Sequence, residues 1–99
     1  MKLPHKGFLL QQLSQVPSYW DYQLIPLALT EYQVQGLYWI NHFSIALDEL
    51  AAAGLINRIS ERIDDGTAIA SGRLLFEYSL SRFGRQRMHD TGLLPEGVE

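Results

Sequence analysis

Residues 44–58, SIALDELAAAGLINR, hold the change of pattern on which the fold depends. Leu47 and Leu50 recur at helical spacing, and the alanines that follow them favour a helix. Gly54 is suited to end that helix, because glycine adopts a positive φ without steric cost. Beyond it the apolar period falls to about two, and the residues expected on one side of an extended chain are Leu55, Ile59 and Ile63. The stretch therefore predicts a packed helix that passes directly into a strand.

A second strand and a last helix are predicted further along the chain. The alternating apolar positions of 74–80 are Leu74, Phe76, Tyr78 and Leu80. Residues 64–72, DDGTAIASG, suit a long hairpin loop, and the DDG at its start reads as a turn rather than as part of a calcium loop. Ser81 can cap a helix that continues to about Asp90.

The N-terminal part of the chain has a weaker pattern. Residues 5–16 show helical spacing and predict a first helix. Residues 17–29 mix aromatic and aliphatic side chains around a proline and give no clean period. There are no repeats, low-complexity tracts or linkers, so we expect residues 1–99 to form a single domain.

The segment before the central helix contains two possible helix starts. Thr30 and Gln33 match a capping box, which predicts a short helix that ends near Asn41. Asn41 or Ser44 would then cap a separate helix that runs to Gly54. Two helices separated by so few residues are expected to cross.

The order helix, helix, helix, strand, long loop, strand, helix is that of a winged helix, and two motifs resemble bacterial winged-helix regulators of the PadR and MarR kind. Residues 46–58 are similar to the "aL-x-x-L-x-x-x-GLI-x-R" end of their recognition helix, and residues 78–84, YSLSRFG, to their "Y-x-L-[ST]-x-x-G" passage out of the second wing strand. The resemblance covers roughly 44–85. It implies an α+β fold, a winged helix-turn-helix with about four helices and a two- or three-stranded antiparallel wing, whose winged core is about 30–85.

The same resemblance implies a transcription regulator that binds duplex DNA as a homodimer. With the second helix of the motif in a major groove, the residues facing base edges would be Asn41, His42 and Ser44. The residues along the wing that would contact phosphates are Arg58, Arg62 and Arg73. Apolar surface for a dimer would come from the terminal segments, with Tyr19, Trp20, Tyr22, Leu93 and Leu94, although the three aromatic residues could equally complete the core.

The charges of the chain weigh against strong binding to DNA. The net charge is −3, and the arginines all lie in the second half, at Arg58, Arg62, Arg73, Arg82, Arg85 and Arg87. The central helix has no cation and carries Asp48 and Glu49, while Asp64 and Asp65 begin the wing loop. Because affinity for DNA comes largely from cations, the DNA hypothesis requires two copies acting together.

Two alternatives stay open at this point. The arginines could form ordinary surface ion pairs, Arg58 or Arg62 with Glu61 or Asp64, and Arg73 with Glu77. The whole domain could instead be a protein–protein interaction module or adaptor, with the acidic helix and the aromatic N-terminal segment as a docking surface.

Other function classes find little support. His5, His42 and His89 are far apart in sequence and no phosphate-binding loop occurs, so we expect no enzyme, no metal and no cofactor. The chain has no cysteine, no apolar run of about eighteen residues and no signal peptide. These features predict a cytoplasmic protein without membrane contact.

Overall fold

The computed structural model describes residues 3–92 and has the arrangement of a winged helix. Its helices are α1 (His5–Leu13), α2 (Asp21–Tyr32), α3 (Leu37–Ala52) and α4 (Arg82–Asp90). Its strands are β1 (Tyr19–Trp20), β2 (Ile56–Ile63) and β3 (Leu74–Leu80), which form an antiparallel sheet in the order β1-β3-β2. The predicted α+β class, with four helices and a three-stranded sheet, is confirmed.

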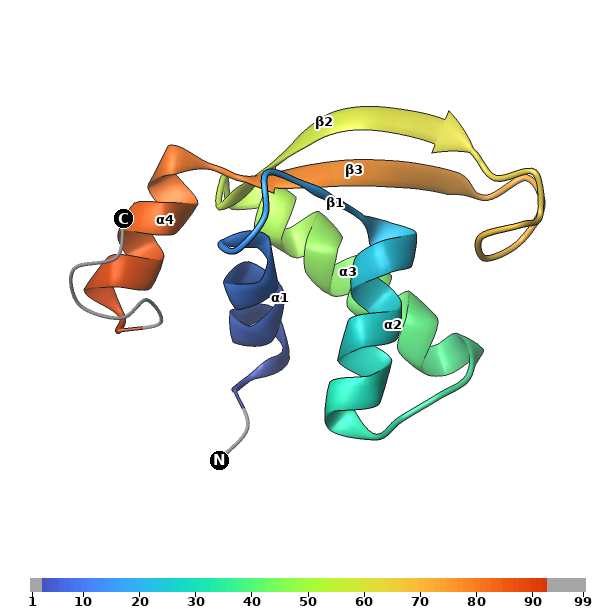
Figure 1. Ribbon diagram of the computed structural model, residues 1–99, viewed down its shortest axis with the longest axis horizontal. Coiled ribbons are helices and arrows are strands. Elements are labelled where there is room, and N and C mark those ends of the chain that lie inside the picture. Colours follow the sequence, from blue (N-terminus) through green and yellow to red (C-terminus); the bar gives the residue numbers. More distant parts are fainter. Residues whose placement is uncertain (1–2, 93–99) are drawn as a thin grey trace.

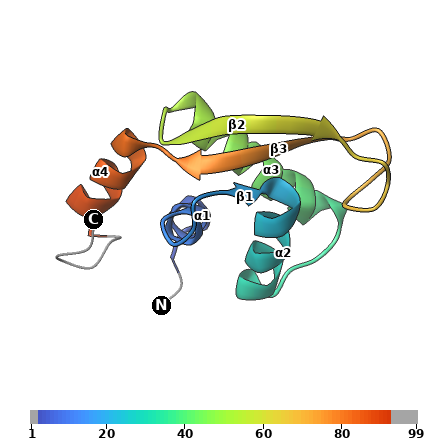
Figure 2. The same cartoon turned by 45° about the horizontal axis from the view of Figure 1, so that its top comes forward.

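The core lies where α1, α2 and α3 meet beneath the sheet (Figure 1). Its buried members are Phe8, Leu9, Leu10, Leu13, Leu24, Ile25, Ala28, Phe43, Ala46, Leu47, Leu50, Ile56, Tyr78 and Met88. The β2–β3 hairpin extends from this body, with its loop at one end of the molecule and α4 at the other (Figures 1 and 2). The N-terminal segment thus contributes a large part of the core.

The exit of α3 at Gly54 is as predicted. Gly54 has φ +79°, and its N–H donates to Ala51 O at 3.0 Å. The N–H of Leu55 donates to Leu50 O at 3.0 Å. These two bonds satisfy carbonyls at the end of the helix and turn the chain into β2.

Ser81 joins the start of α4 to the same turn. Its hydroxyl lies 2.7 Å from Gly54 O and 2.9 Å from Leu55 O, and it accepts the N–H of Gly84 at 2.8 Å. The predicted cap is therefore confirmed, and it also ties two distant parts of the chain together. Gly84 allows this close approach, because a Cβ there would lie 2.0 Å from Leu55 O.

The prediction of two short helices between 30 and 54 is wrong. Thr30 lies inside α2, and Gln33, with φ +56°, follows the end of that helix. The chain then turns through Gly36, with φ +103°, and α3 runs unbroken from 37 to 52. Asn41 therefore lies in the body of the helix and caps nothing. The irregular stretch 17–29 contains β1 and most of α2, whose period is obscured by an internal proline.

The strict alternation of sides predicted along β2 is also wrong. Ile56 is buried, whereas Ile59 and Ile63 are more than half exposed. The pairing with β3 shifts between Arg58 and Ser60, where one extra residue bulges out. A bulge interrupts the alternation of sides, so a strict period of two could not identify the inward face.

The hairpin loop is organised by one aspartate. The carboxylate of Asp64 is buried and accepts backbone N–H groups from Gly66, Ala68, Ile69 and Ala70 at 2.8, 3.2, 2.6 and 2.8 Å. These bonds, that from Ile69 foremost, lower the pKa of Asp64 to about 2. Asp64 thus stabilises the loop through its side chain, in agreement with the turn predicted at the start of residues 64–72.

Candidate nucleic-acid interface

The exposed face of α3 is mostly apolar in its first half. Leu37, Tyr38 and Ile45 are 65, 73 and 57% exposed, and Asn41 lies between them at helical spacing. The opposite side of the helix packs into the core through Phe43, Leu47 and Leu50. No residue from 37 to 45 carries a full charge. The exposure of these apolar side chains could not be predicted from the sequence, because it depends on the position of the helix.

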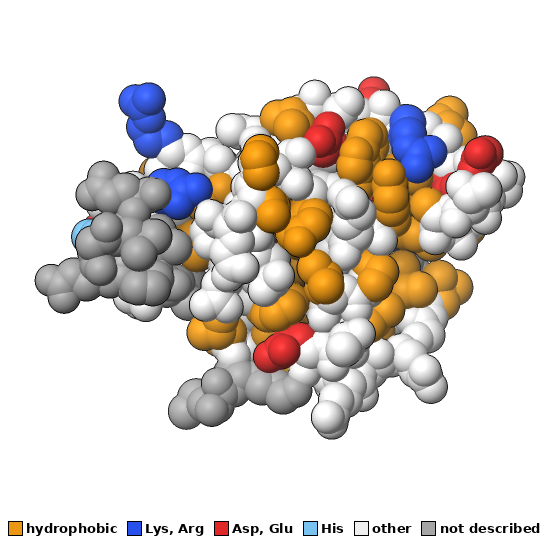
Figure 3. Space-filling model, in the orientation of Figure 1, with side chains coloured by type: hydrophobic (Ala, Val, Ile, Leu, Met, Phe, Trp, Pro, Cys, Tyr) orange, Lys and Arg blue, Asp and Glu red, His pale blue; other side chains and the backbone are white. Residues whose placement is uncertain are grey.

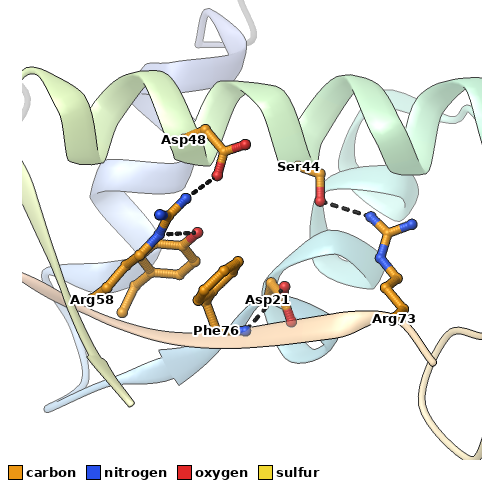
Figure 4. A network of polar contacts seen from close by, with 7 residues as sticks. Asp21, Ser44, Asp48, Arg58, Arg73 and Phe76 are labelled. Atoms are coloured by element: carbon orange, nitrogen blue, oxygen red, sulfur yellow. Dashed lines mark hydrogen bonds and ion pairs between the residues drawn. The ribbon is translucent and has the colours of Figure 1, made fainter. Parts of the chain in front are cut away.

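Arg73 reaches from the start of β3 to this face of α3. Its Nη2 donates to Ser44 Oγ at 2.8 Å (Figure 4). Its Nη1 donates to Asn41 Oδ1 at 3.2 Å. The structure therefore brings together three of the six predicted site residues. We call Arg73, Asn41 and Ser44 the recognition cluster.

Arg58 lies on the same side of the hairpin as Arg73, but its positive charge is partly offset by a nearby acid. Its guanidinium forms an ion pair with Asp48 of α3, and its Nε donates to Tyr78 Oη at 3.3 Å (Figure 4). The guanidinium carbon also lies 4.1 Å from the centre of the Phe76 ring. The hydrogen bond with Tyr78 and the charge of Asp48 both raise the pKa of Arg58. Arg58 is thus ion-paired, but with Asp48 of α3 and not with Glu61 or Asp64, the partners predicted from the sequence.

Arg62 lies on the other face of the hairpin. It pairs with Leu75 in the β2–β3 ladder, whereas Arg58 pairs with Tyr78, and these two β3 residues point to opposite sides. The guanidinium of Arg62 lies over the stacked rings of Trp20 and Tyr22, at 5.5 and 5.1 Å from their centres. Arg62 is therefore separate from the recognition cluster and holds the hairpin to the body of the domain.

His42 also points away from the recognition cluster. Its Nε2 lies 2.8 Å from Nδ1 of His5, the first residue of α1. Trp39 and Phe43 pack against its ring edge to face. Burial, and then the proximity of His42, lower the pKa of His5. His42 thus connects α3 to α1, a role that its 37-residue separation from His5 hid in the sequence.

Asp21 is a buried carboxyl behind the recognition cluster. The residue is 3% exposed, and its Oδ2 accepts the N–H of Phe76 at 3.3 Å (Figure 4). Its Oδ1 has no hydrogen-bond partner within the described part of the chain. Burial therefore raises the pKa of Asp21, against the smaller effects of its hydrogen bonds and of Arg73. Nothing in the sequence indicated this residue.

The acids of α3 lie in its second half and are both paired. Asp48 is bound to Arg58, and Glu49 lies 3.2 Å from Lys6 of α1. Elsewhere, Arg82, Arg85 and Arg87 belong to α4, at the end of the molecule away from the hairpin loop. Figure 3 accordingly shows cationic side chains over α4 and, apart from them, over the outer hairpin. The two carboxylates of α3 are thus offset by cations of neighbouring elements.

Comparisons with models of protein families, with curated proteins and with solved structures find no match to this chain. Within residues 3–92, no three histidine, aspartate or glutamate side chains gather as a possible metal site. None of the helices in the same range combines the length and apolar character needed to cross a membrane.

Proposed function

We propose that this protein is a winged-helix transcription regulator that binds duplex DNA through α3 and the β2–β3 hairpin. The observation that carries the proposal is the recognition cluster. Arg73 of the hairpin and the polar side chains of α3 form one surface, in which Asn41 is of a residue type that binds base edges in the major groove and Arg73 of a type that binds phosphates.

The distribution of charge along α3 supports an approach by its first half. In helix-turn-helix proteins the N-terminal residues of the recognition helix contact the bases. Residues 37–45 have no acidic side chain, while Asp48 and Glu49 lie further along and are neutralised by ion pairs. The first half of α3 can therefore enter a groove without bringing an unpaired carboxylate toward phosphate.

The small number of cations implies that two copies share one DNA site. Arg73 and Arg58 are the arginines on this face of the hairpin, and Arg58 is already bound to Asp48. Each phosphate contact contributes about one unit to the slope of log K against log salt, so a single copy would bind weakly. A homodimer on half-sites roughly 34 Å apart would double the contacts. The predicted contribution of Leu93 and Leu94 to such a dimer lies outside the described residues.

Fluorescence anisotropy with a labelled duplex, from about 50 to about 200 mM salt, tests this proposal. We expect affinity to fall steeply with salt, and Arg73→Ala to reduce the slope by about one unit per protomer. Arg85→Ala is the matched control, because it removes an arginine from α4 at the other end of the molecule. Binding that ignores salt, or an equal effect of the two substitutions, would contradict DNA binding through this face.

A second candidate is a protein-docking module. It is favoured by the large exposed side chains of α3, Leu37, Tyr38 and Ile45, on a helix without a cation. If duplex binding stays weak at low salt and is unchanged in Arg73→Ala, this candidate replaces the first.

A further inference from the structure

The exposed side chains of α3 are suited to some base pairs and not to others. Leu37, Asn41 and Ile45 follow one another at intervals of four residues, and Tyr38 lies beside them. One stripe of the helix therefore presents two aliphatic side chains, one tyrosine and one amide to any surface that covers it.

The apolar side chains match thymine. The C5-methyl of thymine is the apolar group that an A·T pair presents in the major groove, and aliphatic side chains pack against it. A G·C pair presents as many polar groups in the major groove, O6, N7 and N4, but no methyl group to offset the cost of covering them with apolar side chains. Covering polar groups in this way is unfavourable.

The polar members of the surface give no competing preference for G·C pairs. Oδ1 of Asn41 accepts from Arg73, so its amide nitrogen can donate to N7 of either purine, O6 of guanine or O4 of thymine, and it does not itself discriminate between the pairs. The amino group of cytosine requires an acceptor, and the carboxylates of α3 are both ion-paired. Guanine is read chiefly by arginine or lysine, which α3 lacks. The guanidinium of Arg73, on the hairpin, is already hydrogen-bonded to Asn41 and Ser44.

We infer that the DNA bound by this protein is rich in A·T pairs beneath the first half of α3, and that contacts with thymine methyl groups carry the preference. This inference rests on the proposed function, which it deepens by naming the class of site.

Synthetic duplexes of roughly 24 base pairs, long enough for two half-sites, provide the test. We expect alternating dA-dT to bind more tightly than alternating dG-dC. Replacing every thymine by deoxyuridine removes the methyl groups and leaves the minor groove unchanged. The affinity should then fall by about fourfold for each methyl that is covered.

A third duplex separates the two grooves. Alternating inosine-cytosine has the major-groove groups of G·C and the minor-groove groups of A·T. We expect it to bind like dG-dC. If it binds like dA-dT, the preference arises in the minor groove and the inference is overturned.

Variants assign the methyl contacts to α3. Ile45→Ala should reduce the difference between thymine and deoxyuridine duplexes, whereas Ile59→Ala, at an equally exposed isoleucine of β2, should leave it unchanged. Equal affinity for thymine and deoxyuridine duplexes, with binding still sensitive to salt, overturns the inference and leaves the proposed function standing. Absence of salt-sensitive binding to any duplex overturns both.

Discussion

The two halves of α3 are held in different ways. The second half is fixed by backbone hydrogen bonds at Gly54, by the Ser81 hydroxyl, which donates to Gly54 O, and by two ion pairs. The first half is held from the core side, and its outer face is covered by little more than Arg73. The comparison indicates that the second half fixes the architecture and the first half is left available for binding. Substitutions in the two halves should therefore separate stability from recognition.

The largest effect is expected at the junction that fixes the second half. Gly84→Ala would place a Cβ 2.0 Å from Leu55 O and 2.9 Å from the Leu80 side chain. Since the nearest atom belongs to the backbone, α4 must move away from the Gly54 turn. We expect a loss of about 3 kcal/mol in the free energy of unfolding, measured by urea denaturation.

Gln86→Ala, on the exposed side of the same helix, is the control for Gly84→Ala and should change stability by less than about 0.5 kcal/mol. If Gly84→Ala were as mild as this control, the junction would not be the anchor of the fold.

The contrast between the halves also explains what the sequence could and could not reveal. The exit at Gly54 and the cap at Ser81 depend on residues within a few positions of one another, so local chemistry predicts them. The end of α2 depends on a positive φ at Gln33, which a glutamine does not predict, and the nearby Thr30 matches the pattern of a helix start although it lies inside α2. A local pattern was therefore misleading where the chain uses an unusual conformation.

The site was less predictable than the fold because its contacts join distant residues. Arg73 and Asn41 are 32 residues apart, and the winged-helix resemblance was the reason to place both on one surface. His42 and Arg62 were assigned to the same surface by the resemblance, yet they face α1 and the Trp20–Tyr22 stack. The side of a helix or strand on which a residue lies depends on the bulge in β2 and on the start of α3, and neither was evident in the sequence.

An intermediate effect is expected at Asp21, which lies behind the recognition cluster. Its pKa in the folded protein is raised above the ordinary value of 3.8, because burial disfavours the charged carboxylate. The folded state therefore binds this proton more tightly than the unfolded state. The resulting stabilisation is fully present below about pH 3.8 and is lost as the pH rises through the raised pKa.

Asp21→Asn removes this titration and keeps an oxygen that can accept from Phe76. We expect the variant to be more stable than the wild type at pH 7 by up to about 1 kcal/mol, with the advantage disappearing near pH 4. Urea denaturation across that pH range measures it. An advantage that grows as the pH falls would show that the carboxylate is stabilised by a partner, contrary to its position.

The smallest effect is expected for the ion pair between Arg58 of β2 and Asp48 in the second half of α3. Asp48→Asn releases Arg58 from its partner, at a cost in stability below about 0.5 kcal/mol, because both side chains are roughly half exposed. A freed guanidinium on the same face as Arg73 should make the salt dependence of duplex binding steeper by up to about one unit per protomer. Glu49→Gln is the matched control, since it releases Lys6 on α1 and away from the hairpin. If Asp48→Asn leaves the salt dependence unchanged while Arg73→Ala reduces it, Arg58 has a structural role only. The DNA surface is then confined to the first half of α3 and Arg73.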